Sequence, residues 1–376
     1  MKPLAYYQAV ATLTGCIIGA GVLAIPYVVA RSGFWTGMLV LLVLGIATLF
    51  VHLLVGEVSL RTKECSQLSG LAEKYLGKHG KYAMLVSMIV GVYGALIAYT
   101  LGVGASLAVL FGGPAWAWSV AFYAVMAGVI FGGIQYLARS ELYLEWIKFI
   151  VLGIILLILF TSRNFNASRL SGFSWSHILL PYGVILFAYL GTAAIPEMRE
   201  ELKLCLRFTK RAIIIGSLIP IITYALFTAA VVGVSGAYTS EMAAIALGPL
   251  VGVAGLVMLH IFAILAMATS FIALGFALKQ AYAKDFNLPE VEAWALVVVL
   301  PAVLMSLGVQ SFVRTLDIAG TFAGGLAGIL IVLIHARAKK SKERKPEYTI
   351  EMSKFGYGTL ILLFALGMLY QLVRLI

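Results

Sequence analysis

The chain has 376 residues and a formal net charge of +11, with 62% hydrophobic and only 11% charged residues. This composition is too apolar for a soluble globular domain and indicates a membrane protein. The positive charge does not require nucleic acid as a partner, because basic residues in short loops lie beside anionic lipid headgroups. The lipid bilayer is therefore the first partner that the sequence predicts.

Apolar segments of the right length recur along the whole chain. A hydrocarbon core of about 30 Å is crossed by about 20 helical residues, and on that basis the sequence predicts eleven transmembrane helices. The expected spans are 7–31, 36–58, 82–111, 116–136, 140–161, 177–200, 208–232, 249–280, 291–308, 313–335 and 355–375. The first span is too long for a cleavable signal and lacks a cleavage site. The predicted fold class is all-α and integral to the membrane.

The basic residues predict how these spans are oriented. A cytoplasmic N-terminus places 21 of the 27 Lys and Arg inside, and only five outside or at the outer interface. Basic residues concentrate in cytoplasmic loops. We therefore expect a multi-pass protein of the plasma membrane with a cytoplasmic N-terminus and an extracellular C-terminus. The three cysteines, Cys16, Cys65 and Cys205, match no metal-site spacing and are expected to be structural thiols.

The first span contains a cluster of glycines in its middle, at Gly15, Gly19 and Gly21. Backbone groups without a hydrogen-bond partner cost several kcal/mol in hydrocarbon, so unwound backbone survives there only where it lines a cavity. The cluster predicts that this helix unwinds over 15–21 and that a ligand binds at the break.

The sixth span is interrupted in the same way, between Phe187 and Pro196. Proline lacks an amide proton and disfavours helix in the residue before it, so a second half-helix is expected to start near Ile195. The first and sixth spans occupy corresponding places in two blocks of five. Because five is odd, the second block enters the membrane upside down, which is typical of transporters. The predicted units are 1–161, 177–335 and the eleventh helix, 355–375.

Three smaller features complete the expected architecture. Glycines in the third span predict close helix packing. The segment 66–77 predicts a short amphipathic helix ended by Gly77 on the cytoplasmic face, and 239–248 a capped helix over an outer vestibule. The packing glycines are Gly91, Gly94, Gly102 and Gly104.

Lys148 is the one Lys or Arg in the interior of a span, away from its ends. At 1.5 Å per residue it lies about 14 Å above Arg139, close to mid-membrane. A charge there costs at least about 2.5–3.5 kcal/mol and indicates a function. Two structural alternatives are a pair with Glu145, three residues earlier on the same helix, and a side chain that reaches back to the cytoplasmic interface.

The broken first span, Gly-x-x-x-Gly-Ala-Gly-Val-Leu from Gly15 to Leu23, resembles amino-acid permeases of the amino acid-polyamine-organocation superfamily. With the following Ala-Ile-Pro-Tyr, the match is closest to the hydroxy/aromatic amino-acid permease and amino-acid/auxin permease branch. The Ile-Pro-Glu of the sixth span also fits that branch. The resemblance implies the LeuT fold, which is a five-plus-five inverted repeat with helices 1 and 6 unwound at mid-membrane, here with an extra C-terminal helix.

The same resemblance implies secondary active transport of neutral or aromatic amino acids by alternating access, without a cofactor. In such permeases the substrate carboxylate meets backbone amides of the first break, its ammonium meets carbonyls of both breaks, and the sixth span borders its side chain. The oligomeric state is left open, with a monomer as one option. The residues implied to bind substrate are Cys16, Ile17, Gly19, Ala20, Gly21, Phe187, Ala188, Tyr189, Gly191 and Thr192.

Two coupling ions compete. In proton-coupled permeases that the fifth span resembles, a lysine ammonium fills the sodium position, and Lys148 stands at the matching place. In sodium-coupled members, two adjacent hydroxyls join backbone carbonyls around the ion, and oxygen ligands suit a hard cation. We favour proton-coupled symport and keep sodium as the alternative. The matching sodium-site residues are Gly15, Ile18, Ala266, Thr269 and Ser270.

Other classes of protein fit less well. An enzyme would need a cluster of histidines or carboxylates, and Asp317 in the tenth span is expected only to pair with Arg314. A channel would need a continuous polar stripe. A sensor that does not transport would need a signalling domain or a long tail, and the termini outside the spans have only a few residues. The sensor remains the less favoured alternative.

Overall fold

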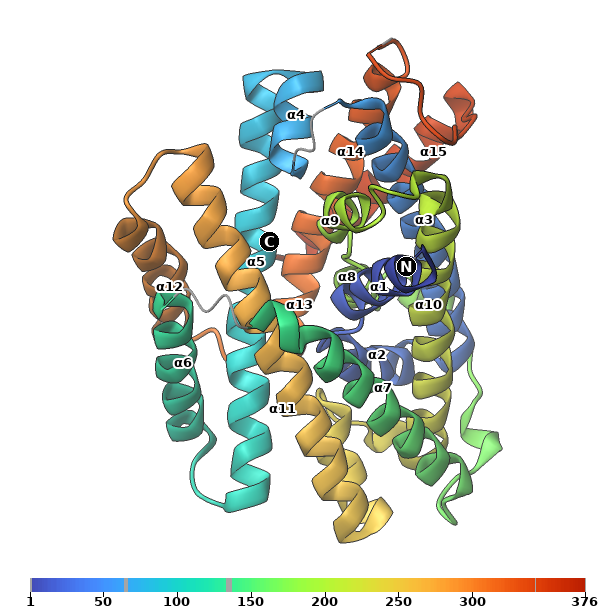
Figure 1. Ribbon diagram of the computed structural model, residues 1–376. Helices are drawn as coiled ribbons and strands as arrows, with labels where there is room; N and C mark the ends of the chain where they lie inside the picture. The colour runs from blue at the N-terminus through green and yellow to red at the C-terminus, as the bar shows by residue number, and fades with distance from the viewer. Residues whose placement is uncertain (1, 64–66, 133–136, 342, 376) are drawn as a thin grey trace.

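The computed structural model describes residues 2–63, 67–132, 137–341 and 343–375, without the side chains of 2, 3, 137–145, 249, 284 and 285. Every regular element in this part of the chain is helical (Figure 1). The helices of the first half are α1 Lys2–Ile17, α2 Gly21–Ser32, α3 Phe34–Arg61, α4 Leu68–Leu76, α5 Lys78–Phe111, α6 Ala115–Gly132, α7 Leu137–Thr161, η1 Ala167–Arg169 and η2 Trp175–His177. Those of the second half are α8 Tyr182–Ala188, α9 Ala194–Glu201, η3 Leu206–Phe208, α10 Thr209–Ser235, η4 Gly236–Tyr238, α11 Ala243–Asp285, α12 Glu290–Ser306, α13 Phe312–Ala319, the π-helix η5 Gly320–Gly324, α14 Gly325–Ala338 and α15 Lys354–Leu375.

The all-helical membrane architecture is confirmed. Within the described ranges, seven helices are long and apolar enough to cross a membrane, or eight if α1 and α2 form one bent span. Each expected span coincides with one helix or with consecutive helices, and the spans beyond these eight fall on α7, on α8 with α9, and on α12. The eleven-span inverted repeat itself stays a prediction.

The first helix is broken where the glycines predicted, although the break is shorter than expected. Helix α1 ends at Ile17, α2 begins at Gly21, and the two axes bend by 51°. Gly15 remains inside α1, because a single helical glycine costs only about 1 kcal/mol and packing offsets it.

The second break separates α8 from α9. It spans 189–193, and α9 begins at Ala194, one residue before the predicted Ile195. Pro196 lies in the first turn of α9, where a missing amide proton leaves no helical hydrogen bond unmade. Both predicted interruptions are therefore present.

The two broken helices lie in the middle of the bundle, between the packed pair α5 and α11 on one side and α3 and α10 on the other (Figure 1). Helix α1 packs against α9 and α10, and α2 packs against α3, α8 and α10. Backbone at this depth needs internal hydrogen-bond partners. Pro220 in α10 cannot donate to the Gly216 carbonyl, and the Thr14 hydroxyl of α1 lies 3.3 Å from that oxygen.

The predicted packing glycines are confirmed by their surroundings. A Cβ at Gly94 would collide with Ala319, one at Gly102 would lie 2.5 Å from Met267 Sδ, and one at Gly91 would lie 3.0 Å from Ala323 Cβ. A Cβ at Gly104 would collide with Ser119. Small residues thus let α5 approach its neighbours closely.

The two predicted loop helices are also present. Helix α4 ends at Gly77, whose φ of +79° favours glycine. The helix expected at 239–248 begins later, at Ala243, where the Ser240 hydroxyl accepts from the Ala246 amide. It continues into α11 across a kink at Gly252, where φ is +75°.

Candidate functional site

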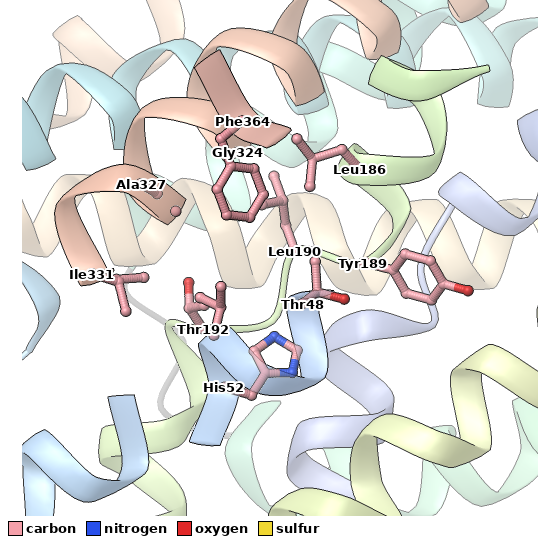
Figure 2. Close-up of a pocket in the computed structure, with 12 residues that line it drawn as sticks. Thr48, His52, Leu186, Tyr189, Leu190, Thr192, Gly324, Ala327, Ile331 and Phe364 are labelled. Carbon is pink, nitrogen blue, oxygen red and sulfur yellow. The ribbon is translucent and has the colours of Figure 1, made fainter. Parts of the chain in front are cut away.

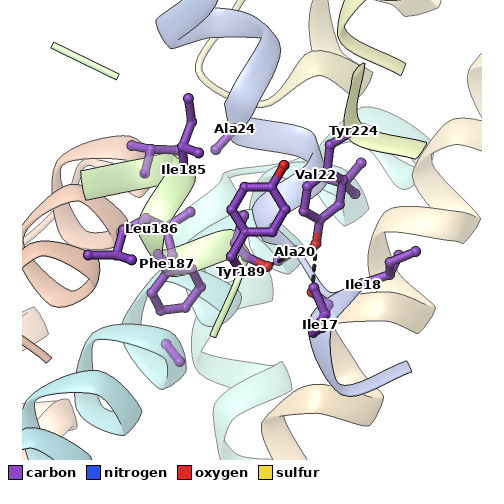
Figure 3. Packing of buried hydrophobic residues seen from close by; sticks show 14 of the residues in the cluster. Ile17, Ile18, Ala20, Val22, Ala24, Ile185, Leu186, Phe187, Tyr189 and Tyr224 are labelled. Carbon is purple, nitrogen blue, oxygen red and sulfur yellow. Dashed lines mark hydrogen bonds between the residues drawn. The ribbon is translucent and has the colours of Figure 1, made fainter. Parts of the chain in front are cut away.

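The two breaks touch each other, and glycine makes the contact possible. A Cβ at Gly21, the first residue of α2, would lie 2.6 Å from the Ala188 Cβ at the end of α8. A Cβ at Gly191 would collide with the Ile17 side chain at the end of α1. Only residues without a side chain allow backbones this close. The fold thus brings together the two segments that the sequence analysis singled out separately (Figure 3).

Tyr224 joins the ends of both broken helices. Its hydroxyl lies 2.6 Å from the Ile17 carbonyl oxygen and 3.0 Å from that of Ala188, and its side chain is fully buried on α10 (Figure 3). The hydroxyl carries one proton, whereas each carbonyl oxygen has two lone pairs. Because the Gly19 amide also donates to the Ile17 oxygen at 2.9 Å, the Ala188 oxygen is the one that keeps a lone pair for another donor, such as a substrate ammonium. The sequence analysis missed Tyr224 because it lies within an uninterrupted helix.

The start of α2 offers donors to an anion. The first amides of a helix have no acceptor within it and form its positive end. The resemblance implies that the amides of Gly19, Ala20 and Gly21 bind the carboxylate, but Gly19 donates its amide to the Ile17 carbonyl at 2.9 Å. Ala20 and Gly21 then supply the helix-terminal donors, and Val22 follows them.

The first break also faces α5 and α11. A Cβ at Gly19 would lie 3.2 Å from Ser270 Oγ and 3.6 Å from Tyr99 Oη. Tyr93, six residues before Tyr99 on α5, instead lies 3.0 Å from the Tyr282 hydroxyl. Tyr99 therefore borders the break, whereas Tyr93 ties α5 to the end of α11.

Lys148 lies at the hydroxyl pair that resembles a sodium site. Its Nζ is 3.3 Å from Thr269 Oγ1, and the residue is 3% exposed. Thr269 donates its own hydroxyl to the Leu265 carbonyl at 2.9 Å, so its lone pairs are available to accept from the ammonium. The ammonium thus lies at the sodium-like position that the resemblance implied for it, beside Ser270.

The other residues implied in ion binding lie around the same place. Ala266 lies one turn before Thr269, and the Thr269 hydroxyl is 3.3 Å from the Ala266 carbonyl oxygen. Ile18 is buried in the first break, and Gly15 is buried one turn earlier in α1. The alternative partner Glu145 has its side chain outside the described residues.

The remaining candidates of the sixth span point elsewhere. Phe187 packs against the π-helix η5, where a Cβ at Gly320 would lie 2.6 Å from Phe187 Cβ. Tyr189 stacks on Tyr224 with ring centroids 5.3 Å apart, and Thr192 lines a small cavity next to α3. Cys16, at the end of α1, is exposed.

The pairing expected for Asp317 is wrong. Its carboxylate accepts from Gln371 at 3.1 Å and from Arg374 at 3.2 Å, both on α15, whereas Arg314 is exposed. Arg314 and Asp317 are close in sequence, but Asp317 lies on the buried face of α13, whereas Arg314 lies at the surface. A bond to α15 also satisfies a buried carboxylate that would otherwise be costly.

Comparisons with known proteins identify the family to which the chain is similar. The model of the tryptophan/tyrosine permease family matches residues 4–374. Glutamine transporter 2 of Aliivibrio fischeri is 26% identical, over 95% of this chain and 96% of its own. The tyrosine-specific transport system 1 of Haemophilus influenzae is 24% identical, over 95% and 93%. The amino acid transporter AVT1H of Arabidopsis thaliana is 26% identical over 28% of this chain and 25% of its own.

Proposed function

This chain belongs to the tryptophan/tyrosine permease family, and from that premise we propose that it is a proton-coupled amino-acid symporter that works by alternating access. It is a transporter and not an enzyme, as its family indicates. The observation that carries the coupling proposal is the buried Lys148 ammonium beside Thr269. The substrate site proposed is the junction of the two breaks.

The junction supplies both kinds of group that an α-amino acid needs. The amides of Ala20 and Gly21 at the positive end of α2 suit a carboxylate. The carbonyl of Ala188 suits an ammonium, with Tyr224 holding it beside the Ile17 carbonyl. Unwound segments of two corresponding helices are where transporters of this architecture bind substrate at mid-membrane.

Lys148 supports protons rather than sodium as the coupling ion. An ammonium within hydrogen-bond reach of Thr269 supplies the positive charge that a sodium ion would otherwise bring to these hydroxyls. A charge at this depth costs at least about 2.5–3.5 kcal/mol, which favours release of the proton when the site opens to the other side. Protonation and release would then bias α1 and α2 between two arrangements.

Neutral side chains, aromatic ones included, are the proposed substrates. The described residues at the junction carry no acidic or basic side chain that would pair with a charged substrate, apart from Lys148 at the coupling site. Two relatives that match over almost their whole length are named as transporters of glutamine and of tyrosine, both neutral amino acids.

We further propose an orientation with the N-terminus in the cytoplasm, supported by the 21 basic residues that this orientation places inside.

The test is uptake of radiolabelled neutral amino acids into proteoliposomes that contain the purified chain. An inward proton gradient, an inward sodium gradient and no gradient are compared, each with native protein and with Lys148→Met. We expect concentrative uptake only with the proton gradient and only with native protein. Sodium-driven uptake would transfer the coupling role to Thr269 and Ser270 and contradict the proposal.

A further inference from the structure

A small cavity adjoins the second break on its α3 side. It is lined by residues of α3, of α8 and the break, of η5 and α14, and by Phe364 of α15, with none from α7 or α11. The volume open to the centre of a water molecule is about 20 Å³. One water molecule needs about 10–15 Å³ by this measure and several polar partners, so the cavity is large enough for a single water.

His52 of α3 is the polar group that makes this cavity chemically specific. It is 1% exposed, its Nδ1 lies 2.9 Å from Ser217 Oγ on α10, and its Nε2 has no hydrogen-bond partner in the described part of the chain. Buried polar groups normally have partners, so an orphan nitrogen at a cavity wall indicates a bound group.

The hydrogen-bond network determines which nitrogen carries the proton. Within the described residues, His52 Nδ1 is the one partner of the Ser217 hydroxyl. If the Ser217 hydroxyl donates to Nδ1, the imidazole carries its proton on Nε2. The Nε2–H group is then the one polar group of this pair that lacks a partner. The other tautomer would leave both the Ser217 proton and the Nε2 lone pair unpaired. The Nε2–H form is therefore favoured, and it needs an acceptor.

The cavity offers further groups to a small ligand. Thr48 donates its hydroxyl to the Leu44 carbonyl at 2.8 Å and keeps lone pairs. Thr192 also lines the cavity, and its amide donates to no acceptor among the described residues. The imidazole lies near the Thr48 and Thr192 side chains in Figure 2. The lining holds no acidic or basic side chain besides His52, which argues against an ion.

We propose that this cavity binds one water molecule, held by the Nε2–H of His52, that hydrates the broken segment at 189–193. A water accepts from the imidazole and can return hydrogen bonds to the break. His52 is thus a positioning residue, fixed to α10 through Ser217. This inference does not depend on the substrate or on the coupling ion.

The direct test is hydroxyl-radical labelling by X-ray radiolysis of the purified protein, with mass spectrometry of the modified side chains. Leu186 is 1% exposed and lines this cavity. Leu71 is 2% exposed and lines a second cavity, of about 10 Å³, whose lining is entirely apolar. Apolar cavities of this kind stay dry. We expect modification of Leu186 well above that of Leu71, and equal modification of both would overturn the proposal.

Two variants of His52 separate the water from the fold. In His52→Gln the amide nitrogen takes the place of the Nε2 donor, whereas the shorter side chain of His52→Asn reaches only the Nδ1 position, where its amide oxygen accepts from Ser217. We expect His52→Gln to retain the Leu186 labelling and the native KM for substrate. His52→Asn should reduce the labelling to the level of Leu71 and raise the KM. Equal labelling in both variants and in native protein would contradict the role of Nε2, whatever the state of transport.

Discussion

The Tyr224 hydroxyl lies 2.6 Å from the Ile17 carbonyl oxygen, at the point where α1 ends. The same hydroxyl is 3.0 Å from the carbonyl oxygen of Ala188, the last residue of α8. One side chain on an uninterrupted helix therefore holds the two broken helices together. Its removal should affect both at once.

We expect Tyr224→Phe to lower the free energy of unfolding, because the Ala188 carbonyl loses the hydroxyl donor and the Ile17 carbonyl keeps only the Gly19 amide. A buried polar group left without a partner costs about 1–3 kcal/mol. Thermal unfolding of the purified protein in detergent measures this. Tyr182→Phe is the matched control, since among the described residues its hydroxyl has one bond, of 3.3 Å, to the Leu363 carbonyl. Equal destabilisation by both variants would show that Tyr224 has no special role.

Gly21→Ala should abolish transport or prevent folding, because the new Cβ would lie 2.7 Å from Ala188 Cα. Overpacking costs about 1–3 kcal/mol or more where backbone must move. Gly153→Ala on α7 is the control, since no atom of the described residues lies within 4 Å of its Cβ position. Expression yield and uptake report the difference. Unchanged uptake with Gly21→Ala would contradict the close contact of the two breaks.

Cys16 provides a reporter of substrate at the first break, since it is exposed whereas Cys205 is buried. On a background of Cys65→Ser and Cys205→Ser, we expect N-ethylmaleimide to label Cys16. A transported amino acid should slow this labelling, because the ligand covers the end of α1. A charged amino acid that is not transported serves as the control. A labelling rate that no amino acid changes would place the substrate elsewhere.

A buried ionic cluster anchors the segment after α14. Glu57 on α3 accepts from Arg61 at 2.8 Å, from His335 at 3.0 Å and from the Ile350 amide at 2.6 Å. Removing one partner of a buried pair costs about 3–5 kcal/mol. Glu57→Ala should therefore strongly lower the unfolding temperature.

The control for this cluster is Glu347→Ala, which removes a more exposed pair with Arg344. Pairs of that kind contribute about 0–1 kcal/mol, so the unfolding temperature should hardly change. A similar fall in the unfolding temperature of both variants would mean that the burial of Glu57 does not determine how much it stabilises the fold.

Local sequence features were enough to predict the two breaks. Glycine and proline act through the backbone of their own segment, so Gly19, Gly21 and Pro196 signal an interruption without knowledge of the fold. The limits of the first break were less accurate, because Gly15 stays helical through its packing.

Contacts between distant segments could not be predicted in this way. Asp317 pairs with Gln371 and Arg374, 54 and 57 residues further along the chain, and not with Arg314. Nothing in local spacing distinguishes these partners. Lys148 and Thr269 likewise meet although they are 121 residues apart, and only the family resemblance, not local spacing, indicated that the lysine lies at the sodium-like position.

The most direct test of proton coupling through Lys148 uses proteoliposomes with a pH-sensitive dye trapped inside. A substrate gradient applied from outside should acidify the lumen with native protein and with Thr48→Ser, a control variant outside the coupling site. With Lys148→Met the acidification should disappear, while substrate still protects Cys16 from labelling. Acidification by Lys148→Met at the native ratio of protons to substrate would contradict the account.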